Sequence, residues 1–264
     1  MADTRNIFYG LRDIKIKKLI EDEKSVASEN IGTGDGVATT FNFTLIYAPV
    51  STSGLSITDG TETFTVSAIG GDGYTATLTG DVGGTGSLNI LTGAGSITFA
   101  AAPGSGVNIT ADYTGTEYDA NYLDIYGVSE FKPSPKYTEK EIKGDDTTLD
   151  TMLSFDQWDL DIKCYGDQND ILSILIGASI STDEKEILQK GTDKPSYFKL
   201  EGQVYDNENG DKHYTFFKCK TTDYTPDHKV DDYATYDIKV KAISLGTNDF
   251  VMYIKKNDTA TAIS

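Results

Sequence analysis

Side chains that commonly carry out acid–base or nucleophilic catalysis are scarce in this sequence. There are two histidines, His213 and His228, and two cysteines, Cys164 and Cys219. No Gly-x-Ser-x-Gly motif occurs that would place a serine nucleophile on a sharp turn between a strand and a helix. The cysteines have no short spacing to each other or to a histidine, which excludes a recognisable zinc pattern and a disulfide framework. The sequence therefore predicts buried free thiols, no enzyme activity and no cofactor or metal.

Two runs resemble ligand-binding loops but lack the residues that such loops need. Residues 32–36 read Gly-Thr-Gly-Asp-Gly, yet no lysine follows and no strand–helix pattern surrounds them, so we expect a flexible junction instead of a phosphate loop. Residues 206–211 begin like a calcium loop, but Phe217 stands where an EF-hand requires glutamate, so we expect a hairpin turn. The acidic pairs at 145–146 and 231–232 could form a carboxylate site, although solvated turns carry such pairs more often.

The overall charge argues against tight binding of nucleic acid. The chain has 41 acidic and 23 basic residues and a formal net charge of −18, whereas a protein that holds phosphates needs a positive surface. The longest apolar run, at 171–178, is too short to span a bilayer, and the first residues lack the apolar segment of a signal peptide. We therefore expect a protein that is made in the cytoplasm and has no membrane partner.

Composition divides the chain into two parts. No lysine or arginine occurs between Lys24 and Lys132, and residues 30–117 contain 17 of the 26 glycines. Such an abrupt change is typical of a separate module. We predict an inserted domain at 30–117 and a discontinuous domain made of residues 1–29 and 118–264.

The inserted module contains seven short alternating runs, which turn residues separate as in an all-β sandwich. In the first run Phe41, Phe43 and Leu45 share one face. A low-complexity linker rich in Gly, Ser and Thr is the alternative, but it would not place apolar residues at every second position. We therefore predict a small β-sandwich with strands at 40–45, 55–57, 63–66, 74–78, 87–90, 96–99 and 107–111.

The flanking pieces are charged and rich in strand patterns, with one helix. Alternation predicts strands at 10–20, with Ile14 and Ile16 facing inward, at 159–165 and at 235–243. Residues 197–205 and 212–220 are predicted to form a hairpin around the turn-rich run at 206–210. A helix is predicted to begin at Asp167, its N-cap, and to end at about Ile176, where Gly177 adopts the left-handed conformation.

Four weak motifs follow one another in the flanking pieces. They are Tyr-Gly-Leu-Arg-Asp-Ile-Lys-Ile-Lys-Lys-Leu at 9–19, Leu-Asp-Ile-Tyr-Gly-Val-Ser-Glu-Phe at 123–131, Thr-Glu-Lys-Glu-Ile-Lys-Gly-Asp-Asp at 138–146 and Asp-Ile-Leu-Ser-Ile-Leu-Ile-Gly at 170–177. Their order and spacing resemble the major tail proteins, or tail tube proteins, of long-tailed bacteriophages. The resemblance covers residues 1–29 and 118–264. The insert departs from the family pattern and looks like the immunoglobulin-like additions that tail proteins carry on their outer surface.

The resemblance implies a mainly β fold, a tail tube sandwich or barrel with one flanking helix, whose copies form hexameric rings. Rings of this family stack into the tube that conducts DNA from capsid to host. The chain would then be a structural virion protein of the tail, assembled in the cytoplasm of a host bacterium. The implied partners are further copies of the chain, a tape-measure protein, and tail terminator and initiator proteins. The insert would decorate the tube exterior, where it either contacts a host-surface glycan or stiffens the tube.

Two sets of residues are candidates for the work of such a tube. A lumen with a negative lining lets DNA pass without holding its phosphates, and the candidate lumen-facing acids are Asp156, Asp159 and Asp161. The termini, 1–8 and 255–264, are candidates for contacts between rings. The long polar stretch at 138–154 is a candidate ring-stacking loop, with an ordinary mobile loop as the alternative. Its candidate stacking residues are Thr138, Lys140, Lys143, Asp145, Asp146 and Asp150.

Two other functions fit parts of the sequence. A bacterial surface or secreted adhesin would use immunoglobulin-like modules such as the insert, but the sequence shows no signal peptide or sorting signal for it. A glycan hydrolase would need a pair of carboxylates on facing strands, and the sequence identifies no such pair. Rings or tubes of purified protein would favour the tail protein, whereas a persistent monomer would favour the adhesin.

Overall fold

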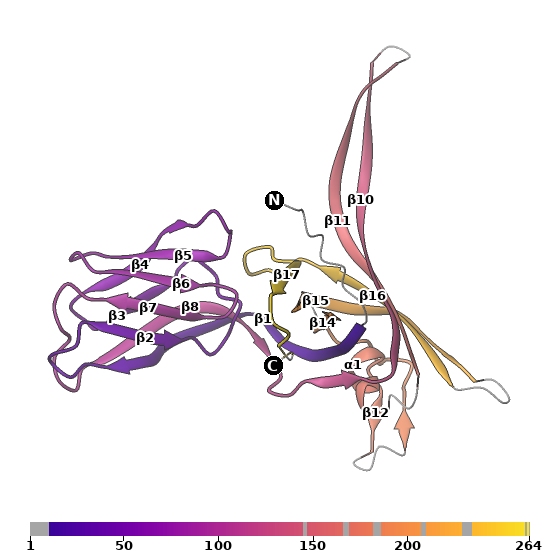
Figure 1. Cartoon of the computed structure of the whole chain (residues 1–264), viewed down its shortest axis with the longest axis horizontal. Coiled ribbons are helices and arrows are strands. Elements are labelled where there is room, and N and C mark those ends of the chain that lie inside the picture. Colours follow the sequence, from indigo (N-terminus) through magenta and orange to yellow (C-terminus); the bar gives the residue numbers. More distant parts are fainter. Residues whose placement is uncertain are drawn as a thin grey trace. The chain divides into compact units, whose positions relative to one another are not determined.

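The chain folds into two compact units that are built mainly from antiparallel strands. The computed structural model describes residues 11–144, 147–165, 169–181, 186–206, 210–228, 234–261 and 263. Unit 1 consists of Met1–Leu19, Asp119–Leu245 and Phe250–Ser264, and unit 2 of Ile20–Tyr118 and Gly246–Asp249. The described part of the chain contains a single, short α-helix among its strands (Figure 1). The predicted mainly β fold class is confirmed.

The division between the units differs from the predicted one at two places. Strand β1 (Leu11–Thr33) belongs to both units, and the change falls after Leu19, whereas the prediction placed it after residue 29. Residues 20–29 resemble the flanking pieces in charge, so composition does not mark the point where the strand changes its neighbours. The loop Gly246–Asp249 also belongs to unit 2, because the Asn248 side chain donates to Val50 O at 2.6 Å and accepts from Thr52 N.

Unit 1 is one antiparallel sheet. The strand order is β10-β11-β16-β15-β14-β1, with β9 paired to β1 and β17 paired to β15. The strands are β9 (Leu123–Ile125), β10 (Val128–Gly144), β11 (Thr147–Tyr165), β14 (Phe198–Asp206), β15 (Gly210–Asp227), β16 (Thr235–Ile243) and β17 (Met252–Asn257).

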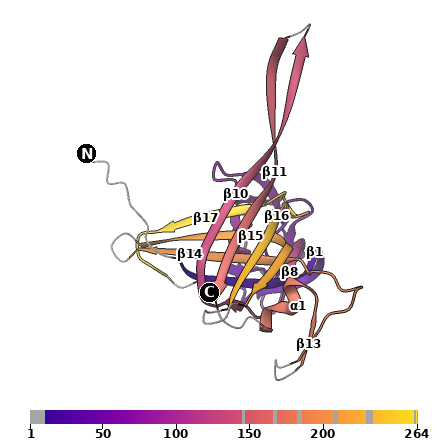
Figure 2. The same cartoon turned by 90° about the vertical axis from the view of Figure 1, so that its right-hand side faces the viewer.

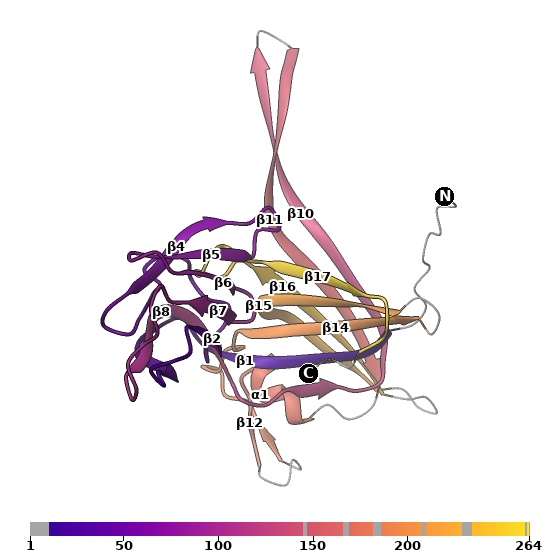
Figure 3. The same ribbon diagram turned by 60° about the vertical axis from the view of Figure 1, so that its left-hand side comes forward.

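Strand β15 is shared by two layers. Its first half, 210–219, lies beside β14 and β17, and its second half, 218–227, pairs with β16. Figure 3 shows β1, β14 and β17 running across the direction of β10, β11 and β16. Apolar side chains from both layers fill the space between them, among them Ile16, Leu160, Phe198, Phe216 and Val240, all at most 2% exposed. Burial of these large side chains is the main stabilising term for unit 1.

The alternation that predicted the strands of unit 1 is confirmed by their burial. Leu160, Ile162 and Cys164 are buried on β11, and Ile238 and Val240 are buried on β16. The predicted strand at 235–243 coincides with β16. The predicted hairpin is formed by β14 and β15, which pair from Phe198↔Cys219 to Asp206↔Gly210.

The helix is shorter than predicted. A 3-10 turn (Asn169–Ile171) leads into α1 (Leu172–Leu175), and Asp167 lies outside the described residues. Gly177 does adopt the left-handed conformation, with φ +76°, and a Cβ there would clash with Lys194 O. The 3-10 turn and α1 together bury Ile171, Leu172 and Leu175, so these apolar side chains reach the core without a longer helix.

Unit 2 is folded, so the alternative of a low-complexity linker is wrong. The order of its strands is β1-β8-β3-β4-β5-β6-β7-β2. All seven predicted strands are present, and Phe64 packs edge-on against Phe99 with ring centroids 5.0 Å apart. The strands are β2 (Thr40–Thr44), β3 (Ser56–Thr58), β4 (Thr63–Ile69), β5 (Thr75–Gly80), β6 (Thr85–Asn89), β7 (Ala94–Thr98) and β8 (Asn108–Tyr118).

Candidate functional site

The most prominent feature of unit 1 is a two-stranded arm. Strands β10 and β11 pair along their whole length, from Val128↔Cys164 to Gly144↔Thr147. Strand β16 covers β11 only along Trp158–Tyr165. Residues 137–144 and 147–156, which we call the arm, therefore extend beyond the sheet without a third strand, and Figures 1 and 2 show them rising from the rest of unit 1.

Four of the six candidate ring-stacking residues lie on this arm, which corrects the prediction of a loop. Residues 138–144 and 147–154 form two paired strands, because hydrogen bonds between the strands satisfy their backbone groups. Lys140 pairs with Met152, and Lys143 with Thr148. Asp150 pairs with Ile142, and Thr138 is exposed beside Ser154. Asp145 and Asp146 lie outside the described residues.

Near its base the arm carries three exposed apolar side chains on one face, which the sequence did not indicate. Tyr137 and Phe155 are a cross-strand pair with ring centroids 6.0 Å apart, and Leu153 lies next along the same face, opposite Glu139. Tyr137, Leu153 and Phe155 are 57%, 67% and 42% exposed. Large apolar side chains on a two-stranded ribbon lack the covering layer that a hairpin needs for stability in water. The exposed apolar side chains of the arm therefore form a surface suited to contact with another molecule.

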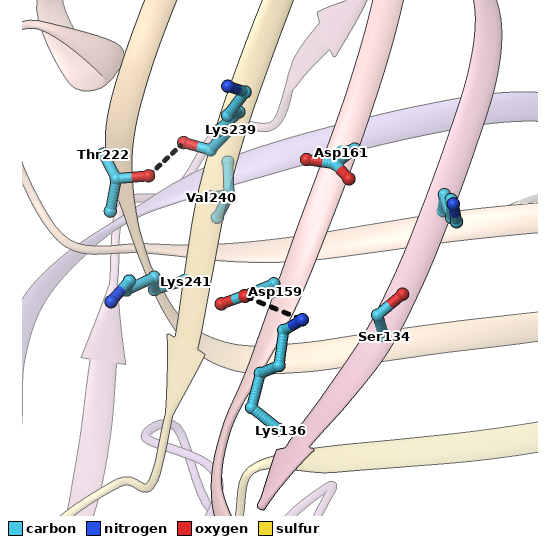
Figure 4. Close-up of a pocket in the computed structure, with 9 residues that line it drawn as sticks. Ser134, Lys136, Asp159, Asp161, Thr222, Lys239, Val240 and Lys241 are labelled. Carbon is cyan, nitrogen blue, oxygen red and sulfur yellow. Dashed lines mark hydrogen bonds and ion pairs between the residues drawn. The ribbon is translucent and has the colours of Figure 1, made fainter.

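A second surface of unit 1 carries interleaved charges. The outward side chains of β10, β11 and β16 form what we call the Lys/Asp face, and register places Asp161 between Lys132 and Lys239. Lys136 lies 3.8 Å from Asp159 (Figure 4). Lys163 lies 3.5 Å from Glu130. A depression of about 240 Å³ lies in this face. The charged residues of the face are Glu130, Lys132, Lys136, Asp159, Asp161, Lys163, Asp237, Lys239 and Lys241.

The three candidate lumen acids are not placed together. Asp159 and Asp161 lie on the Lys/Asp face, one pleat apart. Asp156 falls where the register shifts between Tyr137↔Phe155 and Lys136↔Gln157, so it is the bulged residue at the base of the arm. The face carries five lysines and four carboxylates, and Asp159 and Asp161 are two of the four. This surface is therefore close to neutral, although the whole chain has a net charge of −18.

His213 takes part in a buried polar cluster around Asp211, which has no exposed side-chain surface. The Asp211 carboxylate accepts hydrogen bonds from Gln203 at 2.5 Å, Asn257 at 2.7 Å, and His213 and Thr261 N at 2.9 Å. Burial opposes ionisation of Asp211, but these hydrogen bonds outweigh it and lower its pKa from 3.8 to about 2. The cluster holds the C-terminal segment against β15, which gives His213 a structural role.

The two cysteines and the glycine-rich run at 32–36 also contribute to the fold and form no reactive site. Cys164 and Cys219 are free and buried, as predicted, and burial raises the pKa of the Cys164 thiol to about 11. In the glycine-rich run at 32–36, the Gly34 and Gly36 amides donate to Val107 O and Pro103 O, so these donors are already used. Among the described residues no group of three or more His, Cys, Asp or Glu side chains could hold a metal ion, and no helix has the length and apolarity of a membrane span.

Comparisons with known proteins add no family assignment to this geometry. No model of a protein family matches the sequence, and no curated protein matches it significantly.

Proposed function

We propose that this protein is a structural subunit that assembles with copies of itself into a tube of stacked hexameric rings, as the major tail protein of a long-tailed bacteriophage does. The observation that carries the proposal is the arm, a ribbon with Tyr137, Leu153 and Phe155 exposed on one face. A soluble monomer gains nothing from a long, partly apolar projection, whereas a subunit gains buried area when the projection lies against a neighbouring copy.

The arm favours head-to-tail assembly. It projects from one end of unit 1, where a neighbouring copy can receive it on a surface other than its own arm. Such a contact is heterologous, and it propagates as a closed ring or an open stack according to its rotation. The edge strand β10 carries Pro133 and Pro135, which lack the amide donors that a further strand would need along that edge. Side-chain contacts, more than strand addition, would then join copies along β10.

The Lys/Asp face is our candidate for the wall of the lumen. Lysines on a sheet hold phosphates when nothing neutralises them, because each contact releases counterions from DNA. Here Asp161 lies between Lys132 and Lys239, and Asp159 lies beside Lys241 and 3.8 Å from Lys136. Asp223 of β15 also lies 3.5 Å from Lys239. We infer that these carboxylates mask the lysines, so that DNA passes along the face without being retained.

The remaining parts of the proposal concern location and partners. The tube would belong to a virion tail, assembled in the cytoplasm of a host bacterium with a tape-measure protein and terminator and initiator proteins. Unit 2 would be an immunoglobulin-like decoration on the outer surface, where it either contacts a host-surface glycan or stiffens the tube. The structural role requires no catalysis.

Shortening the arm is expected to abolish tube formation and to leave the fold of unit 1 intact. Thr138 and Ser154 are directly paired, so Asn-Gly can replace residues 139–153 and close a two-residue hairpin between them. None of the described side chains of the removed ribbon belongs to the core of unit 1. The free energy of unfolding of unit 1 should therefore change by less than about 1 kcal/mol. Negative-stain microscopy and sedimentation of the two purified proteins measure the difference.

The parent chain is the positive control, and it is expected to form rings or tubes under the same conditions. A parent chain that remains monomeric at every concentration would contradict the proposed function and favour the adhesin. A shortened variant that still forms tubes would show that the arm does not carry the assembly.

Removing unit 2 is expected to leave assembly unchanged. The Asp119 amide donates to Lys18 O at 2.8 Å, so the two ends of unit 1 lie close enough for a short linker to replace Ile20–Tyr118. Because the arm and the Lys/Asp face belong entirely to unit 1, the shortened chain should still form tubes, of smaller outer diameter. Loss of tubes in a variant whose circular dichroism still shows a folded β protein would contradict the assignment of unit 2 as a decoration.

A further inference from the structure

Strand β2 is an unprotected edge of unit 2. The strand order of this unit begins with β1 and ends with β2, and among the described strands β2 pairs with β7 alone. Its residues, Thr40–Thr44, read Thr-Phe-Asn-Phe-Thr, with no charge and no proline, and their register with β7 has no bulge. Natural sheets usually protect an edge with charges, proline or a bulge.

Two other strands at the edge of a sheet carry such protection. In the part of β1 that belongs to unit 2, charged residues occupy every position at 21–24. Ser28 of the same strand has a φ of +56°, which interrupts its extended backbone. In unit 1, the edge strand β10 contains Pro133 and Pro135. The uncharged edge of β2 therefore stands out in a chain whose net charge is −18.

Alternate residues of β2 direct their backbone groups away from β7. The Leu45 amide donates to Gly93 O at 2.9 Å, on the chain that leads into β7, so the odd-numbered residues point towards β7. Neighbouring residues of a strand direct their N–H and C=O groups to opposite sides, so the even-numbered residues point to the open side. These residues are Thr40, Asn42 and Thr44.

The open stretch of backbone ends at Thr44. The next even-numbered amide, that of Ile46, donates to the Glu29 carboxylate at 3.2 Å. Before β2, the Asp35 carboxylate accepts hydrogen bonds from two amides of its own loop. Both acids are therefore bonded within their own copy, and they flank the uncharged stretch without entering it.

The sequence of β2 reads the same in both directions. In an antiparallel pair of two copies centred on Asn42, Thr40 faces Thr44, Phe41 faces Phe43, and the two Asn42 residues face each other. Each facing pair of even-numbered residues then exchanges two hydrogen bonds. Phe43 is 7% exposed and Phe41 is partly buried, so the aromatic rings of both copies meet on the core side of the layer. Aromatic pairs and threonine pairs across strands stabilise such a ladder.

We propose that two copies of the chain pair through β2, antiparallel and centred on Asn42, so that the layers containing β2 and β7 form one continuous sheet. The contact is the same on both copies, so it closes with two copies and leaves no open edge for a third. The pairing goes beyond the proposed tube function, because it uses unit 2 and is independent of the arm and the Lys/Asp face.

A cysteine at position 42 tests this pairing in the full chain. The Cα atoms of a hydrogen-bonded antiparallel pair are about 5.5 Å apart, a distance that a disulfide spans. Cys164 and Cys219 are buried, so position 42 provides the accessible thiol of the Asn42→Cys chain. Mild oxidation should link this chain into dimers on a non-reducing gel, because pairing holds the two thiols at a high effective concentration.

The matched control is Ser87→Cys. Register places Asn42, Ser96 and Ser87 in one row across β2, β7 and β6, and both Asn42 and Ser87 are exposed. Strand β6 has a partner on each side, so its backbone cannot receive a further strand. The Asn42→Cys chain should form dimers about tenfold faster than the Ser87→Cys chain. Circular dichroism and thermal unfolding of both should match those of the parent, because the substituted side chains are exposed.

Charges at positions 40 and 44 test the register in the Asn42→Cys background. Thr40→Lys with Thr44→Lys places like charges opposite each other and should slow dimer formation about tenfold. Thr40→Lys with Thr44→Glu places lysine opposite glutamate at both ends and should restore the rate. Because the two lysines reduce the negative charge of the chain, random encounters between copies would become faster in the first of these variants.

An Asn42→Cys chain that forms dimers no faster than the Ser87→Cys chain overturns the pairing, and it would leave β2 to a strand of another protein. Equal rates for the two charged variants overturn the register centred on Asn42. A parent chain that forms no tubes contradicts the proposed tube function and leaves this pairing standing.

Discussion

Replacement of Asp211 by Asn is expected to lower the free energy of unfolding of unit 1 by about 3 kcal/mol. Four donors, from Gln203, His213, Asn257 and the Thr261 amide, converge on the buried carboxylate. An asparagine side chain presents its own N–H groups towards some of these donors, so buried polar groups lose their acceptors. The C-terminal segment should become accessible to carboxypeptidase at the same time, because Thr261 is held by this cluster.

The stabilisation from Asp211 should disappear in acid. Its pKa in the folded protein, about 2, is below its ordinary value of 3.8, so the ionised carboxylate stabilises the folded state above about pH 4. This contribution is lost as the pH falls from about 4 to about 2, where the carboxylate takes up a proton in the folded state. Denaturant unfolding at pH 7 and at pH 2.5 should therefore show a large difference between parent and variant at pH 7 and a smaller one at pH 2.5.

Asp258→Asn is the matched control for this substitution. Asp258 lies in the same C-terminal segment and is exposed, so its replacement should change stability by less than about 0.5 kcal/mol. Equal losses of unfolding free energy for Asp211→Asn and Asp258→Asn would mean that the Asp211 cluster adds no stability beyond the effect of removing one negative charge.

Replacing both Asp159 and Asp161 by Asn is expected to convert the Lys/Asp face into a surface that binds DNA. The face carries five lysines and four carboxylates, and the double variant leaves five lysines with two carboxylates. Each lysine that becomes free to neutralise a phosphate adds roughly 0.9 to the slope of log affinity against log salt. The slope for duplex DNA should therefore steepen by about 2, and binding should become measurable at low salt.

A variant with the same net charge but altered elsewhere provides the control. Glu186→Gln with Asp258→Asn also removes two negative charges, at exposed positions outside the Lys/Asp face. Fluorescence anisotropy with a labelled duplex should show binding by the first variant and little change for the second. Equal binding by both would mean that total charge governs the interaction, and it would contradict the masking role of Asp159 and Asp161.

The strands themselves could be predicted from the sequence because strand formation depends on a local pattern. Alternating apolar residues at 160, 162 and 164 and at 238 and 240 had to face a core, and they do. The seven strands of unit 2 follow from the same signal and from the turns between them. The buried cysteines likewise follow from their place within alternating runs.

The sequence did not indicate how far each strand is covered by its neighbours. Phe155 and Leu160 look alike in an alternating pattern, but β16 pairs with β11 beside Leu160 and ends before Phe155. The length of a neighbouring strand therefore decides that one side chain is buried and the other exposed. The same cause makes residues 20–29 part of unit 2, since β1 continues after its neighbours have changed.

The sequence by itself determined the β class, the inserted module and the scarcity of catalytic groups, because these depend on composition and on local periodicity. The tertiary structure decided which distant residues meet. Register places lysines of β10 and β16 beside Asp159 and Asp161, so the expected negative surface is nearly neutral. Folding also gathers Gln203, Asp211 and Thr261 into one cluster and leaves the arm uncovered. Such long-range contacts depend on strand pairing over the whole sheet, which no local pattern encodes.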